Sequence, residues 1–424
     1  MDRWSATKMR KTIAEKLLSH DGIDRRGFLE CMTWAGTGVL WAMKGGVAFG
    51  QETHHATVHD GLTFVQISDS HIGFNKPANE NVIGTLQEAV ARINALRVPP
   101  AFLIHTGDIS HLSKPEEFDA ADQILKTAKV GQVFFVPGEH DVLGDNGKQY
   151  LERYGRQTKG DGWFSFDQKG VHFIGLVNVM NLKAGGLGSL GNEQLEWLEN
   201  DVKHLSSSTP IVVFAHVPLW VVYQDWGWGT DDGERALSFL KRFGSVTVLN
   251  GHIHQTMQKV EGNITFHTAT STAFPQPKPG AAPSPGPMKV PTEQLRSLLG
   301  LTRVTYVKGP HALAIVDSSL APDRMAAGAT VAAAPAATTS GGSANDIHID
   351  NFSFSPGTSN VPAGTRVTWT NHDDIPHNVI STKKHFASPV LDTDQSFSFT
   401  FDKPGSYPYY CSIHPKMTGE VVVG

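Results

Sequence analysis

The chain has 424 residues, of which 40% are hydrophobic and 18% are charged, and its formal net charge is −5. This length is typical of two or three domains, and the ordinary apolar content excludes a wholly disordered chain. The mildly acidic balance gives no sign of a nucleic-acid-binding surface, and two cysteines are too few for a disulfide-built scaffold. The 20 histidines are nearly half as numerous as the 41 acidic residues, which directs attention to metal binding.

The first fifty residues have the pattern of a targeting segment rather than of a folded domain. Arg25-Arg26 precede Phe28-Leu29, and a weakly apolar run from Met32 to Phe49 follows, too short and interrupted for a membrane span. This resembles a twin-arginine signal peptide over residues 1–50. We therefore expect a periplasmic or otherwise exported protein that uses the twin-arginine machinery and has no membrane span in its mature form. The alternative is an amphipathic helix that belongs to the fold.

Residues 57–317 have the alternation typical of one α/β domain. Helical patterns cover Asn79–Leu96, Pro115–Lys126 and Asn192–His204. The strand-like runs are Leu62–Ile67, Ala101–His105, Val133–Val136, His172–Val177, Ile211–Ala215 and Val246–Leu249, with Arg303–Tyr306 and Ala312–Asp317 after a Pro- and Gly-rich surface excursion at 275–291.

Two further segments follow the α/β domain. Residues 318–345 are mostly Ala, Pro, Thr, Gly and Ser, a composition that predicts a linker because it offers little apolar surface to bury. Residues 346–424 then show short alternating strands, which predict a small all-β module.

Polar clusters follow the strand-like runs of the α/β domain, where such sheets place their chemistry. In chain order they are Asp69-Ser70-His71, Gly107-Asp108, Gly138-Glu139-His140-Asp141, His216 and Gly251-His252-Ile253-His254. Carboxylates combined with imidazoles suit Mn, Fe or Zn, and one aspartate can bridge two such ions.

This order of clusters resembles the calcineurin-like metallophosphoesterases, in particular their cyclic-nucleotide-phosphodiesterase-like branch. The resemblance implies an α/β sandwich of sheets flanked by helices, with two divalent or trivalent metal ions. Carried over by position, Asp108 bridges the ions and His140 is the general acid beside the leaving oxygen, with Asp141 orienting its ring. The remaining ligands are Asp69, His71 and His254 on one ion, and Glu139, His216 and His252 on the other.

Glu139 departs from the family pattern, which has Asn at this position. One hypothesis is that Glu139 remains a ligand and lowers the Lewis acidity of its ion, or favours a more highly charged one. The alternative is a degraded second site that holds one metal. Two nearby histidines, His105 and His111, are interpreted as structural.

An aromatic cluster after His216 has two open interpretations. It could form a wall for the organic group of a substrate, or it could pack a loop. Its members are Trp220, Tyr223, Trp226 and Trp228.

The β module carries a second set of metal ligands. Cys411, His414 and Met417 are evenly spaced, and His377 comes from an earlier segment. Two imidazoles, one thiolate and a weak axial thioether are the ligand set of a type 1 copper site. The surrounding segments resemble plastocyanin- and amicyanin-like cupredoxins, which implies an all-β cupredoxin sandwich holding one copper ion. That resemblance makes Asn378 the residue that ties the two ligand loops together.

Taken together, these patterns predict an exported dinuclear phosphoesterase tethered to a copper electron-transfer domain. The substrate would be a phosphoester, with diesters favoured over monoesters, attacked by a metal-bridged hydroxide. The copper domain implies a redox partner protein. The alternative is an electron-transfer protein whose phosphoesterase-like domain is a binding or regulatory module. A third reading couples the two, with the copper redox state affecting hydrolysis.

Overall fold

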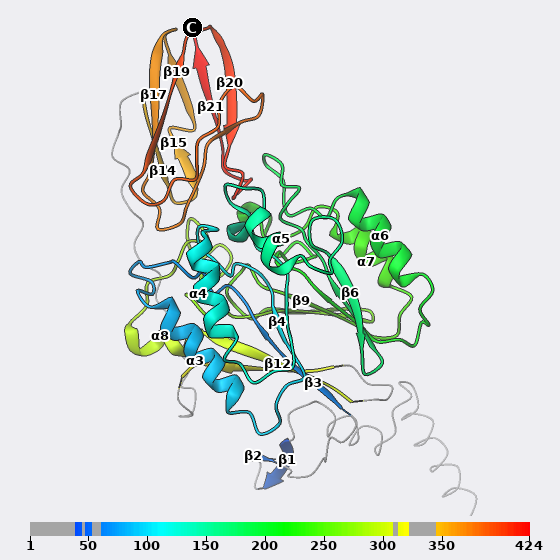
Figure 1. Ribbon diagram of the computed structural model, residues 1–424. Helices are drawn as coiled ribbons and strands as arrows, with labels where there is room; N and C mark the ends of the chain where they lie inside the picture. The colour runs from blue at the N-terminus through cyan, green and yellow to red at the C-terminus, as the bar shows by residue number, and fades with distance from the viewer. Residues whose placement is uncertain (1–38, 45–46, 53–60, 308–312, 322–344) are drawn as a thin grey trace, which may run out of the picture. The chain divides into compact units, whose positions relative to one another are not determined.

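The computed structural model describes residues 39–44, 47–52, 61–307, 313–321 and 345–424 (Figure 1). The chain divides into two compact units, one of residues 1–61 and 304–316, the other of residues 62–303 and 317–424. In the first unit, β1 (Val39–Lys44) pairs antiparallel with β2 (Val47–Glu52). The Arg25-Arg26 pair and most of the expected linker, residues 322–344, lie outside the described residues. No helix in the described part of the chain is both long and apolar enough to span a membrane.

A five-stranded sheet of the α/β region has the order β13-β12-β3-β4-β5. Its strands are β3 (Leu62–Ile67), β4 (Leu103–His105), β5 (Val133–Phe135), β12 (Gly300–Tyr306) and β13 (Ala314–Ser319). Strands β3, β4 and β5 are parallel, so their carboxyl ends meet at one edge. β13 runs two residues beyond the expected domain end at 317, and Leu320 is also buried.

Helices of this layer are amphipathic, as their sequence periods predict. α3 (Val82–Asn94) is preceded by the N-cap residue Asn81, whose side chain accepts a hydrogen bond from the amide of Gly84 and so caps the first turn. It lies beside α4 (Pro115–Leu125), which starts on a proline that needs no amide partner (Figure 1). The shorter α5 (Lys148–Tyr154) adds Tyr150 to the same core, and α8 (Thr292–Leu298) packs Leu295 beside Leu320.

A six-stranded sheet forms the second layer, in the order β10-β11-β9-β8-β7-β6. Its strands are β6 (Phe164–Gln168), β7 (Val171–Gly175), β8 (Ile211–Phe214), β9 (Val246–Asn250), β10 (Gln258–Glu261) and β11 (Ile264–Thr268), and its helices are α6 (Asn192–Val202) and α7 (Gly233–Leu240). The two sheets face one another through aromatic rings: Phe64 lies edge-on to Phe173 at 5.4 Å, and Phe134 stacks on Phe166 at 4.0 Å. These contacts confirm the expected sandwich of sheets.

The C-terminal region is an all-β sandwich, also as expected. One sheet has the order β15-β14-β17-β19 and the other β16-β21-β20-β18. The buried indole of Trp369 lies at the centre of the core between them. The strands are β14 (Asp346–Asp350), β15 (Ser353–Ser355), β16 (Thr358–Val361), β17 (Thr365–Asn371), β18 (Ile380–Ser381), β19 (Ser396–Phe401), β20 (Gly405–Tyr410) and β21 (Thr418–Val423).

Candidate metal centres

Five loops at the ends of β3, β4, β5, β8 and β9 bring all seven predicted ligands of the α/β region into one site. The ligand side chains are 0–6% exposed except that of His252, which is 14% exposed. The loop after β5 forms a short 3-10 helix, η1 (Glu139–Val142), which begins on a ligand. The convergence follows from parallel pairing, because the carboxyl ends of β3 and β4, and likewise of β8 and β9, point the same way.

The backbone of these loops is strained where the ligands attach. The left-handed region of φ and ψ is costly for residues other than glycine, by about 1–3 kcal/mol each, and such strain concentrates at functional sites. Five ligands adopt it: Asp69 at 54°, His71 at 40°, Asp108 at 51°, His252 at 71° and His254 at 52°. The fold therefore holds these side chains in a costly geometry that makes them converge.

Asp69, His71 and His254 form the first group of ligand atoms. Nε2 of His254 lies 3.4 Å from Oδ1 of Asp69 and 3.2 Å from Nε2 of His71. Nδ1 of His254 is 2.6 Å from the carbonyl oxygen of Phe274, to which it donates, so Nε2 is left with its lone pair facing the other two ligands.

Glu139, His216 and His252 form the second group. Oε2 of Glu139 lies 3.0 Å from Nε2 of His216, and Oε1 lies 2.9 Å from Nδ1 of His252. Yet Oε2 of Glu139, Nε2 of His216 and Nδ1 of His252 are buried without a hydrogen-bond partner. Buried polar atoms at such distances without hydrogen-bond geometry fit ligands aimed at a shared ion. The position of Glu139 supports the hypothesis that it is a ligand.

Asp108 lies between the two groups. Its Oδ2 is 3.4 Å from Nε2 of His71 and 3.3 Å from Nε2 of His216. Its other oxygen, Oδ1, accepts a hydrogen bond from the backbone amide of His140 at 2.9 Å, which fixes the orientation of the carboxylate. One oxygen equidistant from both groups is the geometry of a bridging ligand.

Two glycines make this approach of loops possible. A Cβ on Gly138 would lie 2.1 Å from Oδ1 of Asp108, and one on Gly251 would lie 1.9 Å from Oγ of Ser68. Both distances are far below van der Waals contact, so a side chain at either position would displace a ligand loop.

The electrostatics keep the carboxylates ionised. Burial raises the pKa of Asp69, but His254 and His216 outweigh that effect and bring the pKa to about 2. Burial likewise raises the pKa of Glu139, while His252 and His216 hold it well below its ordinary value. Ionised carboxylates are what metal ligation requires, so the residues present fit two hard ions.

His140 points its reactive nitrogen into the site, but the predicted role of Asp141 is wrong. Nδ1 of His140 lies 2.8 Å from the carbonyl oxygen of His111, which fixes the ring and leaves Nε2 available. The carboxylate of Asp141 instead accepts hydrogen bonds from the amides of Ile109, Ser110 and Gly138, because η1 turns it back toward the loop after β4. Asp141 therefore clamps two ligand loops together.

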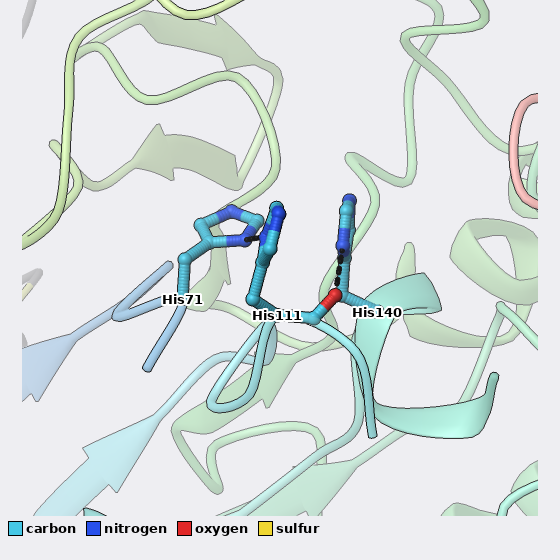
Figure 2. A group of neighbouring side chains, drawn as sticks. All are labelled: His71, His111 and His140. Atoms are coloured by element: carbon cyan, nitrogen blue, oxygen red, sulfur yellow. Dashed lines mark hydrogen bonds between the residues drawn. The ribbon is translucent and has the colours of Figure 1, made fainter. Parts of the chain in front are cut away.

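His111 does more than fill the core, the role that the sequence suggested for it. Its Nδ1 lies 3.4 Å from Nδ1 of His71, and its ring stacks on that of His140 at 5.2 Å and 15° (Figure 2). With its carbonyl bound to His140, this one residue contacts both a ligand and the candidate general acid. His105 matches its structural interpretation: it is buried, and its Nε2 lies 2.8 Å from Oγ of Ser70.

Most of the aromatic cluster packs against itself: the ring of Trp226 lies edge-on to Tyr223 at 5.2 Å and to Trp228 at 5.0 Å. Trp226 and Trp228 line the pocket that contains Glu139 and His140. Trp220 packs against Phe266 at 4.8 Å, in the core of the second sheet.

The predicted copper ligands come together in the β sandwich. Sγ of Cys411 lies 3.7 Å from Nδ1 of His377 and 3.9 Å from Nδ1 of His414, and the two nitrogens are 3.1 Å apart. This triangle of two imidazoles and a thiolate fits trigonal copper. Met417 is buried in the same core, and its carbonyl accepts a hydrogen bond from the amide of Cys411.

A partner of the copper ligands was missed in the sequence. Nε2 of His377 lies 2.8 Å from Oδ2 of Asp373, which orients the ring so that Nδ1 faces Cys411. Asn378 has the expected place: its side-chain amide donates to Oγ of Ser412, and its oxygen accepts from the Ser412 backbone amide at 2.7 Å. The only sequence signal for the contact between Asp373 and His377 is their separation of four residues.

Comparison with family models assigns both regions. Residues 62–256 match the calcineurin-like phosphoesterases, and residues 324–423 match the cupredoxin-like domains.

Curated relatives divide in the same way. Amicyanin-alpha of Methylorubrum extorquens is 38% identical over 106 residues, which are 23% of this chain and 84% of that protein. A probable glycerophosphodiester phosphodiesterase of Arcobacter nitrofigilis is 26% identical over 224 residues, 50% of this chain and 78% of the relative. The serine/threonine-protein phosphatase CPPED1 of Danio rerio is 26% identical over 220 residues, 45% of this chain and 70% of that protein.

Proposed function

Because the chain belongs to the calcineurin-like phosphoesterases through residues 62–256 and to the cupredoxin-like proteins through residues 324–423, we propose that it is a dinuclear phosphodiesterase joined to a type 1 copper domain. The observation that carries the proposal is the position of Asp108, whose Oδ2 lies 3.4 Å from His71 and 3.3 Å from His216. Two bound ions would polarise the phosphoryl oxygens and supply the attacking water.

The protein groups around this centre have distinct tasks. His140, held at Nδ1 by the carbonyl of His111, would give a proton from Nε2 to the departing alcohol oxygen. Asp141 keeps the loops of Asp108 and Glu139 in register through its amide hydrogen bonds. Trp226 and Trp228 line the pocket beside these residues and would limit the access of water to it.

The proposed preference for diesters is based on the space beside the ligands as well as on similarity to phosphodiesterases. A cavity of about 450 Å³ adjoins Glu139 and is lined in part by Met180, Val390 and Ile413. Its size is within the range of small-molecule sites, so it has room for a second ester group. A phosphate monoester would leave it unfilled.

We also infer that the chain is exported by the twin-arginine route, on the basis of Arg25-Arg26 and the apolar run after it. Detection of the mature chain in the periplasmic fraction, lost when both arginines are changed to lysine, would support this inference. Retention of export in that variant would contradict it.

The enzyme proposal is tested by assaying the metal-supplemented chain with bis(4-nitrophenyl) phosphate and 4-nitrophenyl phosphate side by side. We expect faster turnover of the diester and its loss in Asp108→Ala. A preference for the monoester would indicate a phosphatase. Absence of turnover with Mn, Fe and Zn alike would favour the alternative, a copper electron-transfer protein with a phosphoesterase-like binding module.

A further inference from the structure

The pocket over the dinuclear ligands is not lined by the α/β region alone. Glu139, His140 and Asp108 lie on one side, and His414, Phe352 and Ile375 of the β sandwich complete it. Residues 62–303 and 317–424 belong to one compact unit, and all residues that line this pocket lie in that unit.

Several contacts fix the loop of His414 at this pocket. The carbonyl of Pro415, the next residue, accepts a hydrogen bond from the amide of Gly185 at 2.5 Å. Ile375 is buried in the core of the five-stranded sheet, and Leu143 is buried in the core of the β sandwich. The hydrogen bond holds the loop of His414, and the buried side chains of Ile375 and Leu143 hold the two regions together beside it.

The ring of His414 faces both metal centres. Its Nδ1 belongs to the copper triangle, 3.1 Å from Nδ1 of His377. A ring nitrogen of His414 also lies within 4.8 Å of a carboxylate oxygen of Glu139 and of a ring nitrogen of His140. The rings of His414 and His140 are 6.0 Å apart, and Phe352 packs against His414 at 4.7 Å and restricts its rotation.

Coordination at one nitrogen determines what the other nitrogen can do. A neutral imidazole carries a single N–H, so an imidazole that binds copper through Nδ1 has its hydrogen on Nε2 and can only donate there. Copper thus converts a ring with two tautomers into a fixed hydrogen-bond donor.

We propose that His414 serves both centres: it binds copper through Nδ1 and donates a hydrogen bond from Nε2 to a phosphoryl oxygen of the substrate beside Glu139 and His140. Copper loading then strengthens phosphate binding at the dinuclear site. This inference rests on the proposed phosphoesterase function and adds a substrate-contacting residue from the copper domain.

The proposal is tested by the copper spectrum, with inorganic phosphate as the probe. The full chain is loaded with Cu(II) and with zinc, which is silent in electron paramagnetic resonance. Phosphate is then added while the Cu(II) resonance and visible absorption are recorded. We expect both to shift, with the same half-saturation as phosphate binding measured by calorimetry. An unchanged copper spectrum at saturating phosphate would overturn the proposal.

Two controls identify where phosphate binds. The zinc-free Cu(II) protein should show no spectral shift, and an equal shift there would mean that phosphate reaches copper directly, which contradicts the proposal. If calorimetry detects no phosphate binding to the zinc-loaded chain, the phosphoesterase assignment fails together with the inference. Binding with a silent copper spectrum defeats the inference alone.

Two variants distinguish the effect of the His414 hydrogen-bond donor from the effect of bound copper. Cys411→Ala removes the copper thiolate but keeps the imidazole, and His414→Phe keeps a ring but removes the donor. We expect copper to tighten phosphate binding about fivefold in the wild-type chain, the effect of one hydrogen bond. Both variants should bind phosphate with an affinity that no longer depends on copper, and His414→Phe should bind it most weakly. A copper effect that persists in His414→Phe would refute the role of this side chain.

Discussion

Oε2 of Glu139 lies 3.0 Å from Nε2 of His216, yet neither atom takes part in a hydrogen bond. Buried polar atoms without hydrogen-bond partners are costly, and a shared ligand removes that cost. A metal ion held by Glu139 and His216 would satisfy both atoms, and this relationship is the reason to treat Glu139 as a ligand rather than as a degraded position.

Replacing Glu139 by Asn tests that assignment. Because Asn keeps an oxygen ligand but removes one negative charge, we expect Glu139→Asn to bind its ion about tenfold more weakly and, when saturated with metal, to turn over faster. Calorimetric metal titration and diester assays at saturating metal measure both effects. The exposed Glu196→Gln serves as the control. If stoichiometry, metal preference and turnover all match the wild-type chain, the charge of Glu139 has no role.

His111 offers a second test, since its ring contacts His71, a member of the first group of ligands. His111→Phe keeps a ring that can stack on His140 and keeps the backbone carbonyl, but it removes the nitrogen facing His71. We expect the affinity for the first ion to fall about tenfold. The relative rates with alkyl and nitrophenyl leaving groups, which report on His140, should stay unchanged. A selective loss of alkyl-ester turnover would show instead that the ring acts through His140.

Asp373 is expected to tune the copper site without binding the metal. Its carboxylate is 2.8 Å from Nε2 of His377, so Asp373→Ala removes the partner that orients this ligand. Copper affinity should fall about 10–100-fold, with a changed Cu(II) resonance, while Asp373→Asn should retain part of the affinity. Competition with a copper chelator measures the effect. Equal affinity in all three proteins would mean that core packing alone positions His377.

A pH-dependent contribution to stability is expected away from both metal centres. Burial lowers the pKa of His172, but hydrogen bonds to Asp201 and Asp167 outweigh it, so the pKa lies above its ordinary value of 6.5. The protonated ring therefore stabilises the fold below pH 6.5, and this contribution is lost as the pH rises through the raised pKa.

The variant His172→Asn makes this contribution measurable. The wild-type chain should exceed the variant in unfolding free energy by about 1 kcal/mol more at pH 5.5 than at pH 9. Denaturant titrations at the two pH values give the difference, with the exposed His204→Asn as a control. A difference between wild type and variant that is the same at both pH values would exclude the proposed protonation.

The site residues could be predicted from the sequence where metal-binding residue types directly follow a predicted strand or form a compact run. Asp108 and His216 follow buried strands, and Cys411 lies in a compact run of ligands, so their residue types and spacing carry the information. The roles of Asp141 and His111 depend instead on which other loop each residue contacts in the folded chain. A sequence cannot show that η1 turns Asp141 toward the amide of Ser110, nor that the carbonyl of His111 reaches His140.

The elements of the fold likewise divide into those that the sequence predicts and those that it does not. The buried strand β3 has its predicted range, and the amphipathic helices α3 and α4 begin and end within three residues of their predicted bounds. The strand β10 was not anticipated because all four of its residues are exposed, so its sequence has no buried apolar positions to reveal it. The helix α8 was not anticipated because only Leu295 of its seven residues is buried, which gives no helical period. Their structure depends on neighbours, such as β11 pairing with β10.

The most direct test of the central claim is a metal titration of the metal-depleted chain while diester hydrolysis is followed. Six ligands in two groups around a shared oxygen of Asp108 predict that turnover reaches its maximum at two equivalents of divalent ion per chain. The same result is expected in Cys411→Ala, which lacks the copper thiolate. A maximum at one equivalent, or hydrolysis that requires no added ion, would contradict a dinuclear phosphoesterase.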